Sequence, residues 1–210
     1  MISQSTEYQG QFGSFTVTRN DRVGVILYRF GLGVMATCLS LSTVLALKYQ
    51  EPSDIGLTCL YYLFISGLGL SLSQIHIYLV PLHRALKLSW LLGTIASLVL
   101  TFKVAVPIVR YVYENPLSLL FVGFVFVALT GIYFKEAFCF NRLESKFLTP
   151  LVPFLLLGHM AGIFSIAAER ILLLLWCVLF LIFILRKIGQ PLDSDLGDLS
   201  VFAYLYQQKG

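Results

Sequence analysis

The chain alternates between long apolar runs and short polar segments. A membrane-spanning helix needs about 20 mostly apolar residues, and six runs bounded by charges or proline-containing turns approach that length. They cover residues 25–47, 55–80, 88–107, 116–134, 150–167 and 169–188. The pattern therefore predicts an all-α fold, a polytopic transmembrane helix bundle with about six spans.

This pattern divides the chain into a polar N-terminal segment (1–24), a transmembrane domain (25–188) and a polar C-terminal tail (189–210). The 210 residues are 58% hydrophobic and only 12% charged, whereas soluble domains are about 45–50% apolar and about 25% charged. The mean hydropathy is +0.83. These values exclude a soluble globule and a disordered chain, and four cysteines are too few for a disulfide scaffold.

Two dipeptides predict where helices begin. Asn115-Pro116 and Thr149-Pro150 each place a side-chain acceptor at the N-cap and a proline at the first helical position. We therefore expect the fourth helix to begin at Pro116 and the fifth at Pro150.

The basic residues predict the orientation. Of the Lys and Arg side chains, 11 fall on the side that holds both termini and 4 on the other, and cytoplasmic loops of membrane proteins carry the excess of Lys and Arg. Both termini are therefore predicted to be cytoplasmic, or stromal in a plastid. Because the basic residues set the orientation in the membrane, the net charge of +4 does not require a nucleic-acid partner.

The fifth and sixth runs form the weakest pair of spans. Only 15 uninterrupted apolar residues separate Arg170 from Arg186, about 22 Å of helix at 1.5 Å per residue, against a hydrocarbon core of about 30 Å. Starting the sixth helix at Glu169 repairs this and places an acidic residue at the positive end of the helix dipole. The alternative is a re-entrant hairpin that does not fully cross.

His159 is the leading candidate for chemistry inside the bundle. It lies near the middle of the predicted fifth span, where ionisable groups are costly and usually functional. It could ligate a cofactor, relay protons or bond to a quinone-like head group. The alternative is a structural hydrogen bond between helices, beside the small-residue pair Gly158 and Gly162.

His76 is the second candidate cofactor residue, although its depth does not match that of His159. A bis-imidazole haem needs two histidines at the same level on facing helices, and His76 is predicted near the cytoplasmic surface. No pair of Cys or His residues has metal-ligand spacing. The sequence therefore predicts no metal site and names no cofactor.

Two predicted cytoplasmic loops combine basic and aromatic residues. They are His83–Lys87 and Lys135–Lys146, and the second is too apolar for a solvated linker and too charged for a span. Such a face could bind an anionic lipid head group, a phosphorylated ligand or a partner protein; its candidate residues are Arg84, Lys87, Lys135, Glu136, Cys139 and Arg142. The alternative is that these charges only set the topology.

The tails and the missing motifs add little chemistry. The C-terminal tail follows acidic residues with a short aromatic stretch, which could dock on a partner or fold back under the bundle, and the first 20 residues could hold a short extended segment. The spans carry no Walker motif, metalloprotease motif or run of carboxylates. An enzyme is therefore not favoured.

The stretch Lys135-Glu136-Ala137-Phe138-Cys139-Phe140, with Leu148-Thr149-Pro150 and Leu155–His159 after it, resembles a family of integral membrane proteins of unknown function found in cyanobacteria and plastids. The resemblance implies a thylakoid or plasma membrane setting. It implies no catalytic role for any residue.

The leading hypothesis is a non-enzymatic integral membrane protein, either an accessory or assembly factor for a membrane protein complex or a binder of lipid or pigment. A small transporter or channel that uses His159 is the first alternative. A redox protein that binds haem or quinone is the second.

Overall fold

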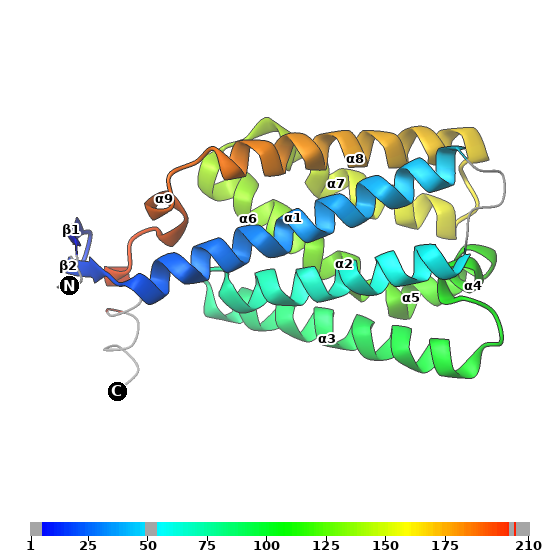
Figure 1. The fold of residues 1–210 in the computed structure, drawn as a ribbon, viewed down its shortest axis with the longest axis horizontal. Helices are drawn as coiled ribbons and strands as arrows, with labels where there is room; N and C mark the ends of the chain where they lie inside the picture. The colour runs from blue at the N-terminus through cyan, green and yellow to red at the C-terminus, as the bar shows by residue number, and fades with distance from the viewer. Residues whose placement is uncertain (1–5, 49–53, 202–203, 205–210) are drawn as a thin grey trace.

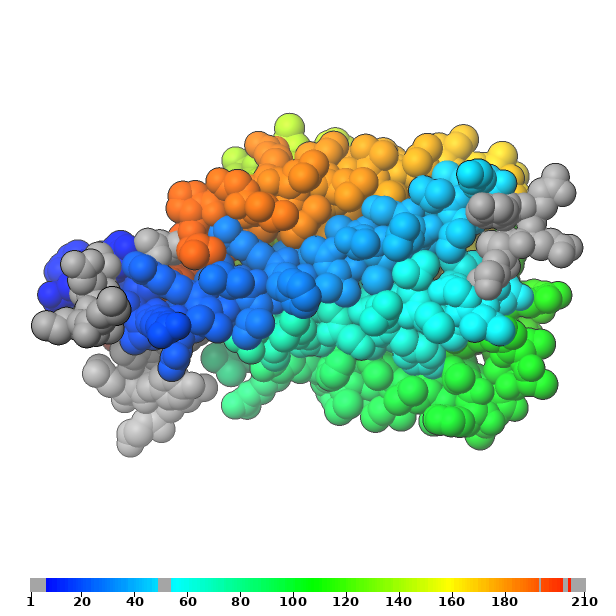
Figure 2. All heavy atoms as spheres, viewed as in Figure 1, coloured from blue at the N-terminus to red at the C-terminus, as the bar shows by residue number. Residues whose placement is uncertain are grey.

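The helices run back and forth along one axis. In the computed structural model, which describes residues 6–48, 54–201 and 204, the long axis is followed in alternating directions (Figure 1) by α1 (Arg19–Lys48), α2 (Asp54–Gln74), α3 (Val80–Lys103), α6 (Phe124–Phe140), α7 (Leu143–Met160) and α8 (Ile166–Ile188). Figure 2 shows α1 lying between α8 and α2 across one face of the bundle.

Short elements occupy the two ends. At one end lie the antiparallel hairpin of β1 (Thr6–Gly10) and β2 (Gly13–Val17) and the short helix α9 (Asp193–Leu196). At the other lie α4 (Ile108–Glu114), the 3-10 turn η1 (Pro116–Ser118) and α5 (Leu119–Val122). We call the first the terminal end and the second the distal end.

The all-α membrane bundle is confirmed, but the prediction of six spans is not. Four described helices, α1, α2, α3 and α8, are each long and apolar enough to cross a bilayer. A fifth span is possible only as the pair Pro116–Val122 and Phe124–Phe140, which is bent by 61°. The described residues therefore support four to five spans.

The predicted start of a helix at Pro150 is wrong. Helix α7 begins at Leu143, so that Pro150 and Pro153 lie inside it. The Thr149 hydroxyl donates to the carbonyl of Ser145 at 2.8 Å, one turn earlier, and so it is not an N-cap. Interior prolines are tolerated in membrane helices because neighbouring groups satisfy the freed backbone carbonyls.

Pro116 does open η1, as expected, but the Asn115 side chain makes no cap. Its amide donates instead to the carbonyl of Tyr111 at 3.0 Å.

The polar N-terminal segment is structured. Residues 6–17 form the hairpin, and α1 starts at Arg19, within the segment that was predicted to precede the membrane domain. Thr18 and Asp21 cap this start reciprocally: the Thr18 amide donates to the Asp21 carboxylate at 2.8 Å, and the Asp21 amide donates to the Thr18 hydroxyl at 3.3 Å.

Two glycines let α1 and α2 approach closely. A Cβ atom at Gly31 would lie 2.5 Å from the Gly67 carbonyl oxygen, and one at Gly67 would lie 2.9 Å from the Gly31 carbonyl oxygen. The Ser71 hydroxyl donates to the carbonyl of Tyr28 at the same crossing, at 3.0 Å. Close backbone packing of this kind holds helices together where no water drives their association.

A cluster of buried charges closes the terminal end of the core. Lys187, near the end of α8, is fully buried and lies between two carboxylates, 2.6 Å from Glu136 of α6 and 2.5 Å from Asp195 of α9. Lys135 and the Tyr28 hydroxyl both donate to Glu136 at 2.9 Å. One ion-pair network thus joins α1, α6, α8 and α9.

Arg29 extends this network to the tail. Its guanidinium donates to Asp195 at 2.8 Å and to the backbone carbonyls of Gln190 and Pro191 at 2.7 and 3.0 Å. The described part of the tail therefore folds back under the bundle.

The hairpin and the tail also contact each other. The Asp198 carboxylate accepts a hydrogen bond from the Gln11 amide at 2.6 Å, and the Ser200 hydroxyl accepts one from the Phe12 amide at 3.1 Å. The rings of Phe12 and Tyr204 are stacked with centroids 4.2 Å apart. The two ends of the described chain form one cap on the terminal end of the bundle.

Replacing Lys187 tests the charge cluster. Lys187→Met leaves two buried carboxylates without their shared cation, and breaking a buried pair costs about 3–5 kcal/mol. At about 2–4 °C per kcal/mol for a chain of this size, we expect thermal unfolding in detergent to shift downward by roughly 10 °C. Arg110→Gln, which breaks an exposed pair, is the control and should change little. Equal stability of the two variants would contradict the role assigned to the cluster.

The contact between hairpin and tail should depend on pH through Asp198. Hydrogen bonds from the Gln11 amide and from Ser200 hold the pKa of Asp198 below its ordinary value of 3.8. The contact is therefore at full strength above that value and is lost as the pH falls through the lowered pKa. Hydrogen exchange of the Gln11 amide should accelerate over that range, and in Asp198→Asn at neutral pH. Glu7→Gln, an exposed change on the hairpin, is the control. An exchange rate of the Gln11 amide that changes neither with pH nor in Asp198→Asn would refute the contact.

Candidate functional site

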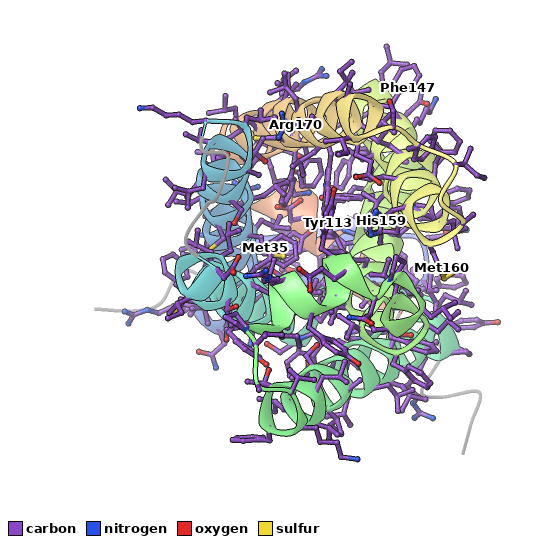
Figure 3. The ribbon with its side chains drawn as sticks, turned by 90° about the vertical axis from the view of Figure 1, so that its right-hand side faces the viewer. Met35, Tyr113, Phe147, His159, Met160 and Arg170 are labelled. Atoms are coloured by element: carbon purple, nitrogen blue, oxygen red, sulfur yellow. The ribbon has the colours of Figure 1, made fainter. Side chains whose placement is uncertain are left out.

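A cavity of about 770 Å³ lies at the distal end of the bundle. Side chains from α1, α2, α4, α5, α6, α7 and α8 line it, and most of them are apolar. The ionisable side chains in its lining are Asp54, Tyr61, Arg110, Tyr113, His159, Glu169 and Arg170. In the view from this end, Tyr113 and His159 lie close together inside the ring of helices (Figure 3). The volume of the cavity is typical of a small-molecule site.

The turn between α7 and α8 places the two central side chains. Gly162 has a φ of +64°, its amide donates to the carbonyl of His159 at 3.0 Å, and the Ile163 amide donates to the carbonyl of Gly158 at 3.0 Å. This Schellman motif ends α7 just after His159. Ser165 then caps α8 through the Ala168 amide, so that Glu169 lies in the first turn of α8.

Glu169 binds two side chains at once. One carboxylate oxygen lies 2.6 Å from Nδ1 of His159, and the other accepts the Tyr113 hydroxyl proton at 3.2 Å. The Tyr113 ring stacks on the imidazole with centroids 4.9 Å apart. Glu169 therefore orients the imidazole, as carboxylates that bind the far nitrogen of functional histidines do.

The other ring nitrogen of His159, Nε2, is buried and has no hydrogen-bond partner among the described residues. A buried polar atom without a partner is costly, at about 1–3 kcal/mol. With Nδ1 committed to Glu169, Nε2 is the atom through which His159 can bind a guest in the cavity.

The rim carries one cation without an ion-pair partner in the described chain. Arg110 lies 2.9 Å from Glu114 and 3.6 Å from Asp54, whereas exposed Arg170 has no hydrogen-bond or ion-pair partner in the described ranges 6–48, 54–201 and 204. Partial burial raises the pKa of Tyr113, as does Glu169, while the charge of Arg170 opposes this rise. Arg170 is thus close enough to act on the site and free to bind an anion.

The core below the cavity is tightly packed. Leu32, Met35, Leu129, Val152 and Phe180 are all fully buried between the cavity and the charge cluster. The cavity therefore reaches His159 from the distal end without continuing to the terminal end.

The family model described as uncharacterized integral membrane protein (DUF2301) matches residues 70–204, about two thirds of the chain. The chain belongs to this family. No curated protein and no solved structure matches it. The family description assigns no activity, so the function of this DUF2301 protein has to be argued from its site.

Most of the site lies within the DUF2301 match. Tyr113, His159, Glu169 and Arg170 fall within residues 70–204, and Asp54 falls outside them. The prediction of an integral membrane protein is thereby confirmed. The restriction to cyanobacteria and plastids stays a prediction.

The structure corrects the predicted depth of His159. The residue lies in the last turn of α7 at the distal end, not in mid-span, because Gly162 ends the helix there. Gly158 packs against the Phe164 ring, on which a Cβ atom would collide at 1.9 Å, and Gly162 lies outside the helix. The two glycines therefore do not form a small-residue interface with another helix.

His76 lies at the opposite end of the molecule, between α2 and α3. Burial lowers the pKa of His76, and the charge of Asp21 opposes this shift. His76 and His159 therefore cannot be the two axial ligands of one haem.

The two predicted basic loops are mostly helical. Arg84 and Lys87 are exposed on the first turns of α3, and Cys139 is exposed on the last turn of α6. Lys135 and Glu136 are buried in the charge cluster, and Arg142, in the two-residue turn before α7, donates to the Gln190 side chain at 2.8 Å. Lys135 and Glu136 are thus engaged with buried partners, whereas Arg84, Lys87 and Cys139 are exposed; that the six residues bind a ligand or partner stays a prediction.

The imidazole–carboxylate pair gives a spectroscopic prediction. The chain has three histidines, so a 15N-histidine spectrum in detergent can be assigned by single substitutions. We expect a strongly downfield Nδ1 proton for His159, because that nitrogen lies 2.6 Å from a carboxylate oxygen. Glu169→Ala should abolish this signal, while His83, whose Nε2 lies 2.9 Å from the carbonyl of Leu72, serves as the unchanged control. A signal that persists in Glu169→Ala would rule out the pair.

Proposed function

We propose that this protein is a non-enzymatic membrane protein that binds an amphipathic ligand of the anionic lipid class in its distal cavity. The observation that carries the proposal is His159, which lines a cavity of about 770 Å³ and whose buried Nε2 has no hydrogen-bond partner in the described chain. Because Nδ1 donates to Glu169, Nε2 is an acceptor. The head group supplies the missing partner by donating a P–OH proton to Nε2, and the hydrocarbon part of the ligand covers the apolar walls.

The free positive charge of Arg170 favours a head group that is negatively charged. Arg110 is neutralised by two carboxylates and Glu169 is engaged by His159 and Tyr113, so Arg170 is the cation at the rim that remains for an anion. A guanidinium binds phosphate or carboxylate oxygens through charge-assisted hydrogen bonds. A phosphate monoester therefore fits this site, because it offers anionic oxygens to Arg170 and a P–OH donor to Nε2 of His159.

The geometry favours binding over catalysis. In acyl transfer, the base His is hydrogen-bonded to a nucleophilic hydroxyl or thiol, and in the described chain no such group bonds to Nε2 of His159. An accessory role in a membrane protein complex is compatible with lipid binding and belongs to the same proposal.

The terminal end is proposed to face the cytoplasm, or the stroma in a plastid. Ten of the described Lys and Arg residues lie on helix ends or turns at the terminal end, against four at the distal end, as the positive-inside rule requires. The cavity then opens on the other side of the membrane, whether plasma or thylakoid.

A small transporter is the second candidate. The cavity reaches His159 from one side while the core and the charge cluster close the other, which is the arrangement of an alternating-access protein open to one side. Uptake of a bound ligand into vesicles would favour this alternative.

Binding of hexadecyl phosphate to the purified protein tests the proposal. We expect saturable binding, weakened about tenfold or more in His159→Leu and in Arg170→Gln, because a hydrogen bond to a charged group contributes about 1.5–3 kcal/mol. Arg110→Gln, a rim cation that already has carboxylate partners, is the matched control and should bind normally.

Two outcomes would overturn the proposal. One is equal binding by the wild type, His159→Leu and Arg170→Gln. The other is a visible absorption band that co-purifies with the wild type and is absent from His159→Leu, which would assign the cavity to a pigment or haem.

A further inference from the structure

A second hollow, of about 420 Å³, adjoins the distal cavity on its side. It lies between α5 and α6 on one wall and α7 on the other, and its described lining includes Leu120, Val127, Thr130 and Leu157. Thr130 is the polar side chain in that lining, and no charged residue lines it. We call this hollow the lateral groove.

The groove and the cavity are adjacent. Leu119, Phe126 and Leu156 line both of them, so these three side chains form the boundary that a ligand chain has to pass to extend from the cavity into the groove. The two spaces differ in chemistry, because the ionisable groups gather in the cavity while the groove is apolar.

The groove opens toward the lipid. Three apolar side chains that line the groove are exposed: Leu120 of α5 (55%), Val127 of α6 (52%) and Leu157 of α7 (58%). In a bilayer these positions face hydrocarbon, which is the environment that such exposed apolar side chains require.

The sequence builds the groove with a helix break. The bend of 61° between Pro116–Val122 and Phe124–Phe140 falls at Gly123, where a Cβ atom would lie 2.2 Å from the Leu119 carbonyl oxygen. Only glycine fits this backbone without a shift. The bend tilts α5 away from the line of α6, and the groove lies beside it against Pro153 of α7.

We infer that the lateral groove is the path by which the ligand enters from the bilayer, and that it holds the hydrocarbon chain of the ligand while the head group lies at His159 and Arg170. This inference rests on the proposed function and narrows it to a membrane lipid with a long chain, in contrast to a compact water-soluble anion.

A chain-length comparison with a built-in reporter tests the inference. Trp176 packs edge-to-face against Phe126 with ring centroids 5.9 Å apart, and Phe126 lines both spaces. In a Trp90→Phe background, Trp176 is the remaining tryptophan. Octadecyl phosphate with a dibrominated chain, added at low mole fraction to phosphatidylcholine vesicles, should quench its fluorescence saturably.

Filling the groove should remove this quenching. We expect Val127→Phe and Leu157→Phe each to weaken the apparent affinity at least fivefold, while Leu98→Phe, an equally large change at a lipid-facing position of α3 that is 42% exposed, leaves it unchanged. Butyl phosphate, which has the same head group and a chain too short to reach the groove, should bind more weakly than the long-chain probe and equally well to all these variants.

The outcomes separate the two proposals. If butyl phosphate binds as tightly as the long-chain probe and both depend on Arg170, the cavity site stands and the groove inference fails. If long-chain quenching survives in both Val127→Phe and Leu157→Phe, the groove inference also fails. If neither phosphate binds to the wild type, the proposed function itself fails.

Discussion

The ion-pair network around Lys187 is the constraint on which the bundle depends. An ammonium group with no exposure to solvent is very unfavourable unless its partners are held at contact distance, and Glu136 and Asp195 lie 2.6 and 2.5 Å away. The Phe140 ring adds a cation–π contact, with its centroid 4.2 Å from the Lys187 nitrogen. Since these groups come from α6, α8 and α9, and Tyr28 from α1, the network fixes the relative depth of elements that are far apart in sequence.

The two ends of the bundle are built on opposite principles. At the terminal end, Arg29, Glu136, Lys187 and Asp195 form ion pairs with one another or with their neighbours, and the hairpin and α9 lie beside them (Figure 1). At the distal end, a helix stops early, another is bent, and the space between them is lined by an imidazole whose second nitrogen has no partner in the described chain. Buried side-chain atoms without a hydrogen-bond partner also occur at the terminal end, on Arg142, Glu144, Ser145 and Asp195. The distal end attracts a functional interpretation because there the residue with the unpaired atom also lines a cavity of about 770 Å³.

The sequence predicts the membrane bundle, but not the start of α7, the depth of His159 or the pairings between distant residues. Apolar runs identify α1, α2, α3 and α8 because length and composition decide whether a helix can span. The sequence is misleading at α7, because Pro150 resembles a helix start. In a bundle, neighbouring groups can satisfy the backbone carbonyl that an interior proline leaves free. His159 was recognised as important, yet its depth depends on Gly162 and Ser165, whose Schellman and N-cap signals are readable in the sequence. Tyr113 and its hydrogen bond to Glu169 were missed, because these residues are far apart in the sequence and meet only when α4 lies at the distal end of the folded bundle. The burial of Glu136 was missed for the same reason, because its partners Lys187 and Tyr28 lie 51 and 108 residues away in the sequence.

The position of Asp195 has a consequence for biogenesis. This carboxylate is contributed by α9, after the last long helix, and it completes the coordination of both Arg29 and Lys187. During synthesis, Arg29 enters the membrane region more than 160 residues before its acidic partner is made. The terminal end therefore cannot close until α9 has been made, and a chain that stops after α8 would leave Arg29 without its carboxylate and Lys187 with Glu136 alone.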